Sequence, residues 1–233
     1  MQTICDSIKD SYATIVAIGD SITAVNSSTQ GQLNWVGLLQ MGLNLPKGYL
    51  VINSGNGGDS LAQGLARLER DVLRFSPTLV IISFGINDAM GGVPLEKFTA
   101  DLRTMISRIR AQGGKILLRT PNPVLDAATG GESVDFRYEP GVPPRPYDVG
   151  AYAAAIVRVA EEEKTLVVDH YSLWKASMST VYRGEMRYLM SDCIHPNGSG
   201  HRRFYHELAP VFGVEPFFQH DWQHILCQSA PVL

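Results

Sequence analysis

TIVAIGDSIT, residues 14–23, is the stretch of sequence that decides the fold. Its first five residues are apolar or β-branched and stop at Gly19, which predicts a buried strand over 14–18. Further short apolar runs predict four more strands, over 49–52, 79–84, 115–118 and 165–168. Apolar residues also recur at helical spacing between these runs, at Leu61, Leu65, Leu68 and Val72, at Phe98, Leu102, Met105, Ile106 and Ile109, and at Tyr152, Ile156 and Val159. Strand followed by helix, repeated five times, predicts an α/β fold with a parallel sheet covered by helices on both faces.

Composition narrows the class of protein. The chain has 233 residues, 45% of them apolar, 18% charged and a formal net charge of −3. No break in composition suggests a linker, so we expect one domain over 1–233. The near-neutral balance gives no clustered positive field for nucleic acid, and no apolar run approaches the roughly 18 residues of a membrane span. We therefore expect a soluble protein with neither a nucleic-acid nor a membrane partner.

The N-terminal residues and the cysteines indicate in which cellular compartment the protein is expected. Residues 1–10 lack the basic-then-apolar order of a signal peptide, so we expect a cytoplasmic location. The three cysteines, Cys5, Cys193 and Cys227, form no C-x-x-C pair. That spacing excludes a disulfide scaffold and disfavours a structural zinc site. We expect no metal and no cofactor.

Two segments stand apart from the strand and helix pattern. Residues 121–146 contain six prolines and three glycines, a long connection that fits either a rigid surface loop or a wall over a substrate site. The C-terminal segment, 213–233, includes the apolar run Phe217-Phe218-Gln219-His220-Asp221-Trp222. Packing against the core is its first interpretation, and a subunit contact in a homo-oligomer is the second.

Polar residues follow the predicted strands, where ligands bind in open parallel sheets. Ser21 follows the first strand, and Asp192 and His195 follow the last strand and a helical segment. Their types fit acyl transfer: Ser21 as nucleophile, His195 as the base that takes its proton, and Asp192 as the group that orients the imidazole. Donors for the developing oxyanion are available from the Gly58 N–H, the Asn87 amide and the Ser21 N–H.

Each of these residues also has an ordinary structural interpretation. Ser21 suits a helix N-cap, Gly58 a left-handed turn, Asn87 a capping or Asx-turn position, and His195 a surface or structural position. Their joint occurrence at strand ends favours catalysis.

Two competing motifs lie beside the second strand. Gly58-Asp59-Ser60-Leu61-Ala62 approximates a nucleophile elbow but ends in alanine, and Ser60 is better placed to cap a helix. The glycines at 55, 57 and 58 hint at a dinucleotide turn, but the third glycine of that fingerprint falls on Ser60. We discount both motifs.

Four segments in order resemble the blocks of the SGNH hydrolases, the GDSL family of esterases and lipases. They are Gly19-Asp20-Ser21-Ile22-Thr23, Asn53 to Asp59, Gly85-Ile86-Asn87-Asp88, and Asp192-Cys193-Ile194-His195-Pro196. The resemblance implies a flavodoxin-like three-layer α/β/α sandwich with a central five-stranded parallel sheet. It also implies metal-free ester hydrolysis through an acyl-enzyme. In it Ser21, Asp192 and His195 form the triad, and Ser21, Gly58 and Asn87 form the oxyanion hole.

The resemblance leaves the substrate open between two branches. Asn53 to Asp88 and His195 to His201 look similar to bacterial carbohydrate esterases, and Gly64-Leu65-Ala66-Arg67-Leu68 resembles the lysophospholipase and thioesterase branch. We favour a small-molecule ester, an acetylated small carbohydrate, because the long loop carries polar and aromatic residues suited to a sugar. Asp20, Arg137 and Tyr138 are the candidate substrate-binding residues.

Two rivals come from other classes. A metal-dependent phosphoesterase would use the carboxylates and the histidine of Asp20, Asp59, Asp88, Asp192 and His195, although the chain has no His-x-His pair. A sugar-binding module without catalysis would retain the same scaffold.

Overall fold

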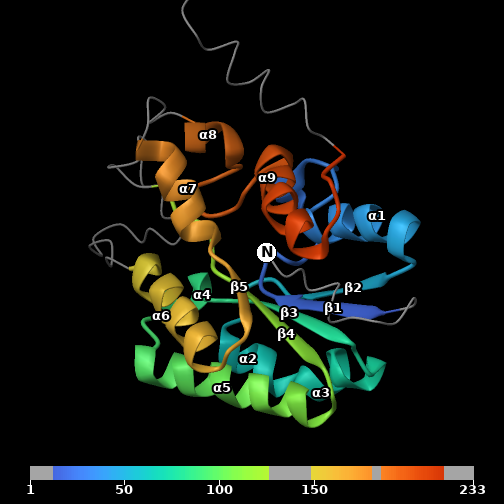
Figure 1. Cartoon of the computed structure of the whole chain (residues 1–233). Helices are drawn as coiled ribbons and strands as arrows, with labels where there is room; N and C mark the ends of the chain where they lie inside the picture. Colours follow the sequence, from blue (N-terminus) through green and yellow to red (C-terminus); the bar gives the residue numbers. More distant parts are fainter. Residues whose placement is uncertain (1–12, 126–147, 180–184, 218–233) are drawn as a thin grey trace, which may run out of the picture.

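One parallel sheet organises the chain. The computed structural model describes residues 13–125, 148–179 and 185–217. Its five strands are β1 (Thr14–Gly19), β2 (Leu50–Gly55), β3 (Leu79–Ser83), β4 (Lys115–Arg119) and β5 (Leu166–Val168). They lie in the order β2-β1-β3-β4-β5, and every neighbouring pair is parallel (Figure 1). This order is the flavodoxin-like one, so the predicted sheet is confirmed.

The second strand is longer than its apolar run predicts. Pairing with β1 continues to Gly55, which lies opposite Gly19. The polar Asn53 is accommodated because its side chain donates to the Thr23 carbonyl at 2.7 Å and accepts from the Gly55 N–H at 2.9 Å. A Cβ on Gly55 would lie 2.2 Å from the backbone nitrogen of Ala24, so this close approach requires glycine.

Helices lie on both faces of the sheet and complete three layers. The α-helices of the described residues are α1 (Trp35–Lys47), α2 (Leu61–Ala66), α3 (Leu68–Asp71), α4 (Ile86–Met90), α5 (Leu95–Ala111), α6 (Val149–Glu162), α7 (His170–Ser179), α8 (Glu185–Leu189) and α9 (Gly198–Leu208). Short 3-10 turns are η2 (Ser27–Thr29), η3 (Leu73–Phe75) and η5 (Ala209–Phe212). Figure 1 shows α1 and α9 on one face, and α2, α3, α5 and α6 on the other. No helix among the described residues combines the length and the apolar character needed to cross a membrane.

The helical spacing at 98–109 and 152–159 marks real helices, whose apolar residues are buried in α5 and α6. The spacing at 61–72 instead covers two short helices, α2 and α3, and the 3-10 turn η3 follows at Leu73. The interruption falls at Arg67, whose backbone leaves the helical region at φ −99° and ψ 4°. The apolar period persists across this break because Leu61, Leu68 and Val72 still face the core.

At the start of the C-terminal segment, Phe217 contacts α9 and is itself 43% exposed. The ring of Phe217 lies 4.8 Å from that of Tyr205, a buried residue of α9. Residues 218–233 lie outside the described part of the chain.

Candidate active site

A tight turn at the carboxyl end of β1 presents Ser21. The Asp20 carboxylate accepts from the Ile22 N–H at 2.9 Å, and the Asp20 carbonyl accepts from the N–H groups of Thr23 and Ala24 at 3.1 and 2.9 Å. Asp20 is buried, whereas Ser21 is half-buried. The buried Asp20 therefore holds the turn in place, and Ser21 lies at the carboxyl end of β1.

Ser21, His195 and Asp192 form a continuous chain of hydrogen bonds. Ser21 Oγ lies 2.9 Å from His195 Nε2, and His195 Nδ1 lies 2.7 Å from Asp192 Oδ2. The other oxygen of Asp192 accepts from the backbone N–H groups of Ile194 and His195, both at 2.7 Å. The histidine thus has one ring nitrogen on a carboxylate and the other on a hydroxyl, the arrangement that lets an imidazole act as a base toward serine.

The electrostatics of this pair suit that use. The hydrogen bond to Asp192 raises the pKa of His195 above its ordinary 6.5, against the opposing effect of burial. Partial burial alone would raise the pKa of Asp192, but the hydrogen bonds from the His195 ring and from two backbone N–H groups lower it. At neutral pH the carboxylate is therefore charged and available to stabilise an imidazolium.

A glycine-rich turn after β2 runs beside the serine. Asn56 and Asp59 close it, because the Asp59 N–H donates to the Asn56 carbonyl at 3.3 Å and the Asn56 amide donates to the Asp59 carboxylate at 2.6 Å. Gly58 within the turn has φ +83°, a conformation that favours glycine. A Cβ on Gly57 would lie 4.0 Å from the Cβ of Ser21, so the turn passes within van der Waals contact of the nucleophile.

Asn87 reaches the same turn from α4, which begins directly after β3. Its side-chain amide donates to the Asp59 carbonyl at 3.0 Å. An amide nitrogen has two hydrogens, and this contact fixes the orientation of the group with one of them. Ser21, Gly58 and Asn87 therefore follow three strands, β1, β2 and β3, that are neighbours in the sheet.

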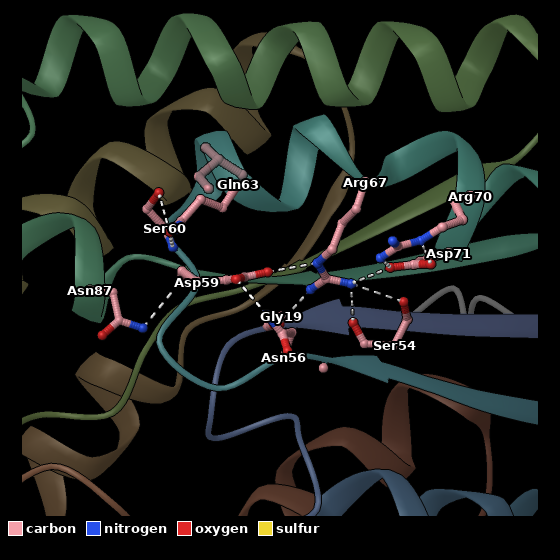
Figure 2. A network of polar contacts seen from close by, with 12 residues as sticks. Gly19, Ser54, Asn56, Asp59, Ser60, Gln63, Arg67, Arg70, Asp71 and Asn87 are labelled. Atoms are coloured by element: carbon pink, nitrogen blue, oxygen red, sulfur yellow. Dashed lines mark hydrogen bonds and ion pairs between the residues drawn. The ribbon is translucent and has the colours of Figure 1, made fainter.

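Arg67 joins these strand ends, although the sequence pattern does not predict it as a site residue. Figure 2 shows its guanidinium between the carboxylate of Asp59, the carbonyl of Gly19 and the end of β2 at Ser54. In the sequence, the one feature that points to Arg67 is its place in the Gly64–Leu68 stretch, which resembles the lysophospholipase and thioesterase branch. Its hydrogen-bond partners include backbone carbonyls, which leave no trace in the sequence.

The carboxylates considered for a metal centre serve other purposes. Asp59 is paired with Arg67 at 2.6 Å, and both oxygens of Asp88 accept from the Leu61 N–H, at 3.0 and 3.2 Å. Burial raises the pKa of Asp88 and of Asp20 to about 6 in each case. Across the described ranges, no three His, Cys, Asp or Glu side chains gather closely enough to hold a metal ion.

A buried cation, which the sequence pattern does not predict, lies at the end of β4. Arg119 is 1% exposed, and its guanidinium carbon lies 4.3 Å from the ring centre of Trp35 and 4.2 Å from that of Phe204. Burial lowers the pKa of Arg119 to about 9, against the charges of Asp20 and Glu207. In the sequence Arg119 only ends an apolar strand, and nothing there reveals the two rings.

Of the three predicted substrate-binding residues, the described structure includes Asp20. Asp20 is 3% exposed and its carboxylate bonds within its own turn, so its position does not support contact with substrate. Arg137 and Tyr138 lie outside the described residues, as does most of the predicted loop at 121–146. Ser60 occupies the N-cap of α2 as expected, with its N–H donating to the Gln63 side chain at 2.8 Å.

Comparison with known proteins shows what the whole chain is similar to. The chain is 31% identical to the esterase TesA of Pseudomonas aeruginosa over 159 residues, covering 68% of this chain and 70% of the relative. It is 28% identical to the isoamyl acetate-hydrolyzing esterase 1 homolog of Bos taurus, over 94% of this chain and 90% of that protein. The crystal structure of Axe2, an acetylxylan esterase from Geobacillus stearothermophilus, is similar with a TM-score of 0.68 and 25% identity, covering 87% of this chain and 95% of that one.

The GDSL-like lipase/acylhydrolase family matches residues 17–203, which include every residue of the hydrogen-bonded chain and of the turn beside it. That span covers most of the sequence and begins within β1. This chain therefore belongs to the GDSL-like lipase/acylhydrolase family and is a carboxylic ester hydrolase of the SGNH type.

Proposed function

We propose that the protein hydrolyses short acyl esters, acetyl esters of small carbohydrates foremost, through an acyl-enzyme formed on Ser21. The observation that carries the proposal is the hydrogen-bonded chain from Ser21 Oγ through the His195 ring to Asp192. It supplies nucleophile, base and orienting carboxylate in contact with one another, without rearrangement.

Acylation starts at the 2.9 Å contact between Ser21 Oγ and His195 Nε2. The serine oxygen bonds to the ester carbonyl carbon while its proton passes to Nε2. The imidazolium so formed is stabilised by Asp192, whose lowered pKa keeps it charged. The tetrahedral intermediate then collapses, the bond to the alcohol oxygen breaks, and His195 returns its proton to that oxygen.

The oxyanion of the tetrahedral intermediate is held by three donors in this proposal. They are the backbone N–H groups of Ser21 and Gly58 and the side-chain amide of Asn87. Donors fixed before the reaction stabilise charge without reorganisation, and removing one typically costs roughly 10²–10³-fold in turnover. Water then attacks the acyl-enzyme with His195 as base, which releases the acid and restores Ser21.

Similarity supports the acetyl preference. Two of the related proteins are named for acetyl esters, an acetylxylan esterase and an isoamyl acetate-hydrolyzing esterase homolog. Their alcohol parts differ, a sugar polymer in one name and a branched alcohol in the other, so the acetyl group is the shared feature. We infer that the small acyl group is the primary determinant, with a sugar alcohol as the preferred leaving group.

The decisive test compares two serines that each follow a Gly-Asp pair. Ser21→Ala is expected to abolish hydrolysis of 4-nitrophenyl acetate and labelling by a fluorophosphonate, with thermal unfolding unchanged. Ser60→Ala, at the N-cap of α2, is the matched control and keeps both. Turnover retained by Ser21→Ala contradicts the assignment, and labelling of Ser21 excludes a purely sugar-binding module. Treatment with a chelator is expected to leave activity intact.

A longer acyl group is the second candidate, and the similarity to the esterase TesA favours it. A series of 4-nitrophenyl esters from acetate to palmitate, followed by acetylated xylose and acyl thioesters, separates the two. We expect kcat/KM to peak at acetate. A peak at eight or more carbons would favour the lysophospholipase and thioesterase branch instead.

The cytoplasmic location stays a prediction. It is consistent with a small, imported ester as substrate rather than an extracellular polymer. Cell fractionation with antibody detection tests it directly.

A further inference from the structure

Arg67 uses all three nitrogens of its guanidinium at the strand ends that flank the serine. Nε donates to Asp59 Oδ2 at 2.6 Å, Nη1 to the Ser54 carbonyl at 2.8 Å, and Nη2 to the Gly19 carbonyl at 3.0 Å (Figure 2). Nη1 also lies 3.4 Å from Asp71. One side chain thereby links the end of β1, the end of β2 and the turn that follows β2.

The carbonyl of Gly19 lies two residues before Ser21. It accepts both from Arg67 and from the backbone N–H of Asn56, at 3.0 Å each. The Asn56 N–H continues the parallel pairing of β1 with β2 beyond Gly55, and Arg67 adds a second donor to the same carbonyl. Arg67 therefore restrains the backbone from which the nucleophile turn departs.

Asp59 transmits the effect of Arg67 to both outer donors of the proposed oxyanion hole. Its carboxylate takes Arg67 on one oxygen and the Asn56 amide on the other, which closes the turn around Gly58. Its backbone carbonyl accepts from the Asn87 amide at 3.0 Å. The position of Asp59 thus sets the direction of the Gly58 N–H and of the Asn87 side chain together.

The Arg67–Asp59 pair is shielded from water. The side chains are 11% and 8% exposed. At such burial, charges are screened less than on the surface, and a partner left alone is a buried, uncompensated charge. Only arginine presents a planar fork of donors that can satisfy a carboxylate and two separate carbonyls at once.

We propose that Arg67 is a positioning residue for the oxyanion hole, acting through Asp59 on Gly58 and Asn87 and through Gly19 on the nucleophile turn. The inference rests on the proposed function, because it assigns Arg67 to the hole in which the Ser21 adduct forms. In this proposal Arg67 makes no contact with the substrate. It fixes the positions of the hydrogen-bond donors that stabilise the negative charge of the transition state.

Misplaced donors weaken the transition state more than the bound ester. A displacement of about 1 Å costs on the order of 10²-fold in rate, whereas ground-state binding depends little on the hole. We therefore expect Arg67→Ala to lower kcat for 4-nitrophenyl acetate by about 10- to 10²-fold, with KM changed less than about threefold. Asp59→Asn should show the same split, and Arg67→Lys should fall between Arg67→Ala and the wild type.

Arg70→Ala is the matched control. Arg70 lies in the neighbouring helix α3 and its side chain is 73% exposed; among the described residues its hydrogen bonds go to Asp71 and not to Asp59 or the strand ends. Its kcat and KM are expected to equal those of the wild type. Guanidinium chloride at low millimolar concentration should partly restore kcat to Arg67→Ala, and urea at equal concentration should not.

Inhibition by benzeneboronic acid separates positioning from general stability. The boronate forms a tetrahedral adduct with a serine and reports on the hole directly. Its Ki is expected to rise with the loss in kcat across Arg67→Lys, Arg67→Ala and Asp59→Asn, at a temperature well below each unfolding midpoint. If Arg67→Ala does not fold, the lysine variant and Asp59→Asn provide the same comparison.

Three results would overturn the inference. They are an unchanged kcat in folded Arg67→Ala, a loss that falls on KM alone, and a loss in kcat with an unchanged boronate Ki. Each of these leaves the esterase assignment standing, because the wild type is active. A wild type that hydrolyses no ester would instead overturn the proposed function, and this inference with it.

Discussion

His195 and Asp192 are three residues apart and bond to each other twice. The ring Nδ1 of His195 lies 2.7 Å from one carboxylate oxygen, and the His195 backbone N–H donates to the other oxygen at 2.7 Å. One carboxylate thus fixes the ring and the backbone that carries it. The orientation of the proposed base is therefore a property of a single local turn.

The acid side of the pH profile should report on this pair. A protonated His195 cannot accept the serine proton, and Asp192 raises the pKa of His195 above 6.5, so activity is lost as the pH falls through a value above 6.5. Asp192→Asn removes the main cause, so the acid limb of kcat/KM should move to lower pH while kcat falls by about 10²–10⁴-fold. Asp20, with a pKa of about 6, also titrates in this range. A limb that stays in place in Asp192→Asn would assign the titration to another group.

Gly58→Ala should harm the hole more than the fold. Its φ of +83° strains any side chain, but a Cβ there meets no atom within 4 Å. Gly113, between α5 and β4, has the same open surroundings at φ +82°. It precedes the amino end of β4, whereas the proposed site lies at the carboxyl ends of the strands. We expect both alanine variants to lose about 1 kcal/mol in the free energy of unfolding, and only Gly58→Ala to lose kcat. Equal kcat in the two variants would remove Gly58 from the proposed site.

Asp88→Asn should stabilise the protein at neutral pH. Burial raises the pKa of Asp88 from 3.8 to about 6, so the folded state holds its proton more tightly than the unfolded state does. The contribution of Asp88 to the free energy of unfolding therefore falls between about pH 4 and pH 6 and stays lost above. Asparagine keeps an oxygen for the Leu61 N–H without a charge, and we expect a gain of about 1–3 kcal/mol at pH 7 to 8.

Urea unfolding from pH 3.5 to 8 checks this expectation. The gain should vanish below about pH 4, where Asp88 is neutral in both states. Glu69→Gln, which changes an exposed carboxylate of α3, is the control and should show no gain that depends on pH in this way. A stabilisation independent of pH would show that the charge of Asp88 is not its cause.

Arg119 fills the space between two rings, and its removal should leave a cavity. Within the described residues, its Nε and Nη1 have no hydrogen-bond partner. We expect Arg119→Ala to lower the free energy of unfolding by about 2–4 kcal/mol. Arg119→Met should cost less, because it fills the space, contacts the rings through sulfur and removes two buried donor nitrogens that have no hydrogen-bond partner. Equal costs in urea unfolding would contradict this account.

The sequence predicts the sheet and the residues at its edge for the same reason. Short β-branched runs mark strands, and a polar residue directly after one, such as Ser21 or Asn87, has few places to be other than the carboxyl edge. The Asp-x-x-His spacing of Asp192 and His195 adds contact within one turn. The strands, the polar residues that follow them and the Asp-x-x-His turn all depend on residues close together in the sequence, so a sequence pattern can predict them.

The contacts of Arg67 and Arg119 are with residues far away in the sequence, so no sequence pattern predicts them. The apolar period at 61–72 predicts a continuous helix, yet the chain breaks at Arg67, whose side chain bonds the ends of β1 and β2. Likewise, β2 continues through Asn53 because its amide finds the Thr23 carbonyl. Each contact joins residues far apart in sequence, and backbone carbonyls are the same at every position.

Along the chain, the strands of the sheet come before two of the proposed catalytic residues. The five strands of the described ranges all precede residue 169, whereas Asp192 and His195 come after them, and the contact between Ser21 and His195 spans 174 residues. In the proposed mechanism, Ser21 is therefore synthesised long before its base and remains an ordinary alcohol until the segment that carries Asp192 and His195 packs beside it. Hydrolytic activity would then report that this segment has folded into place.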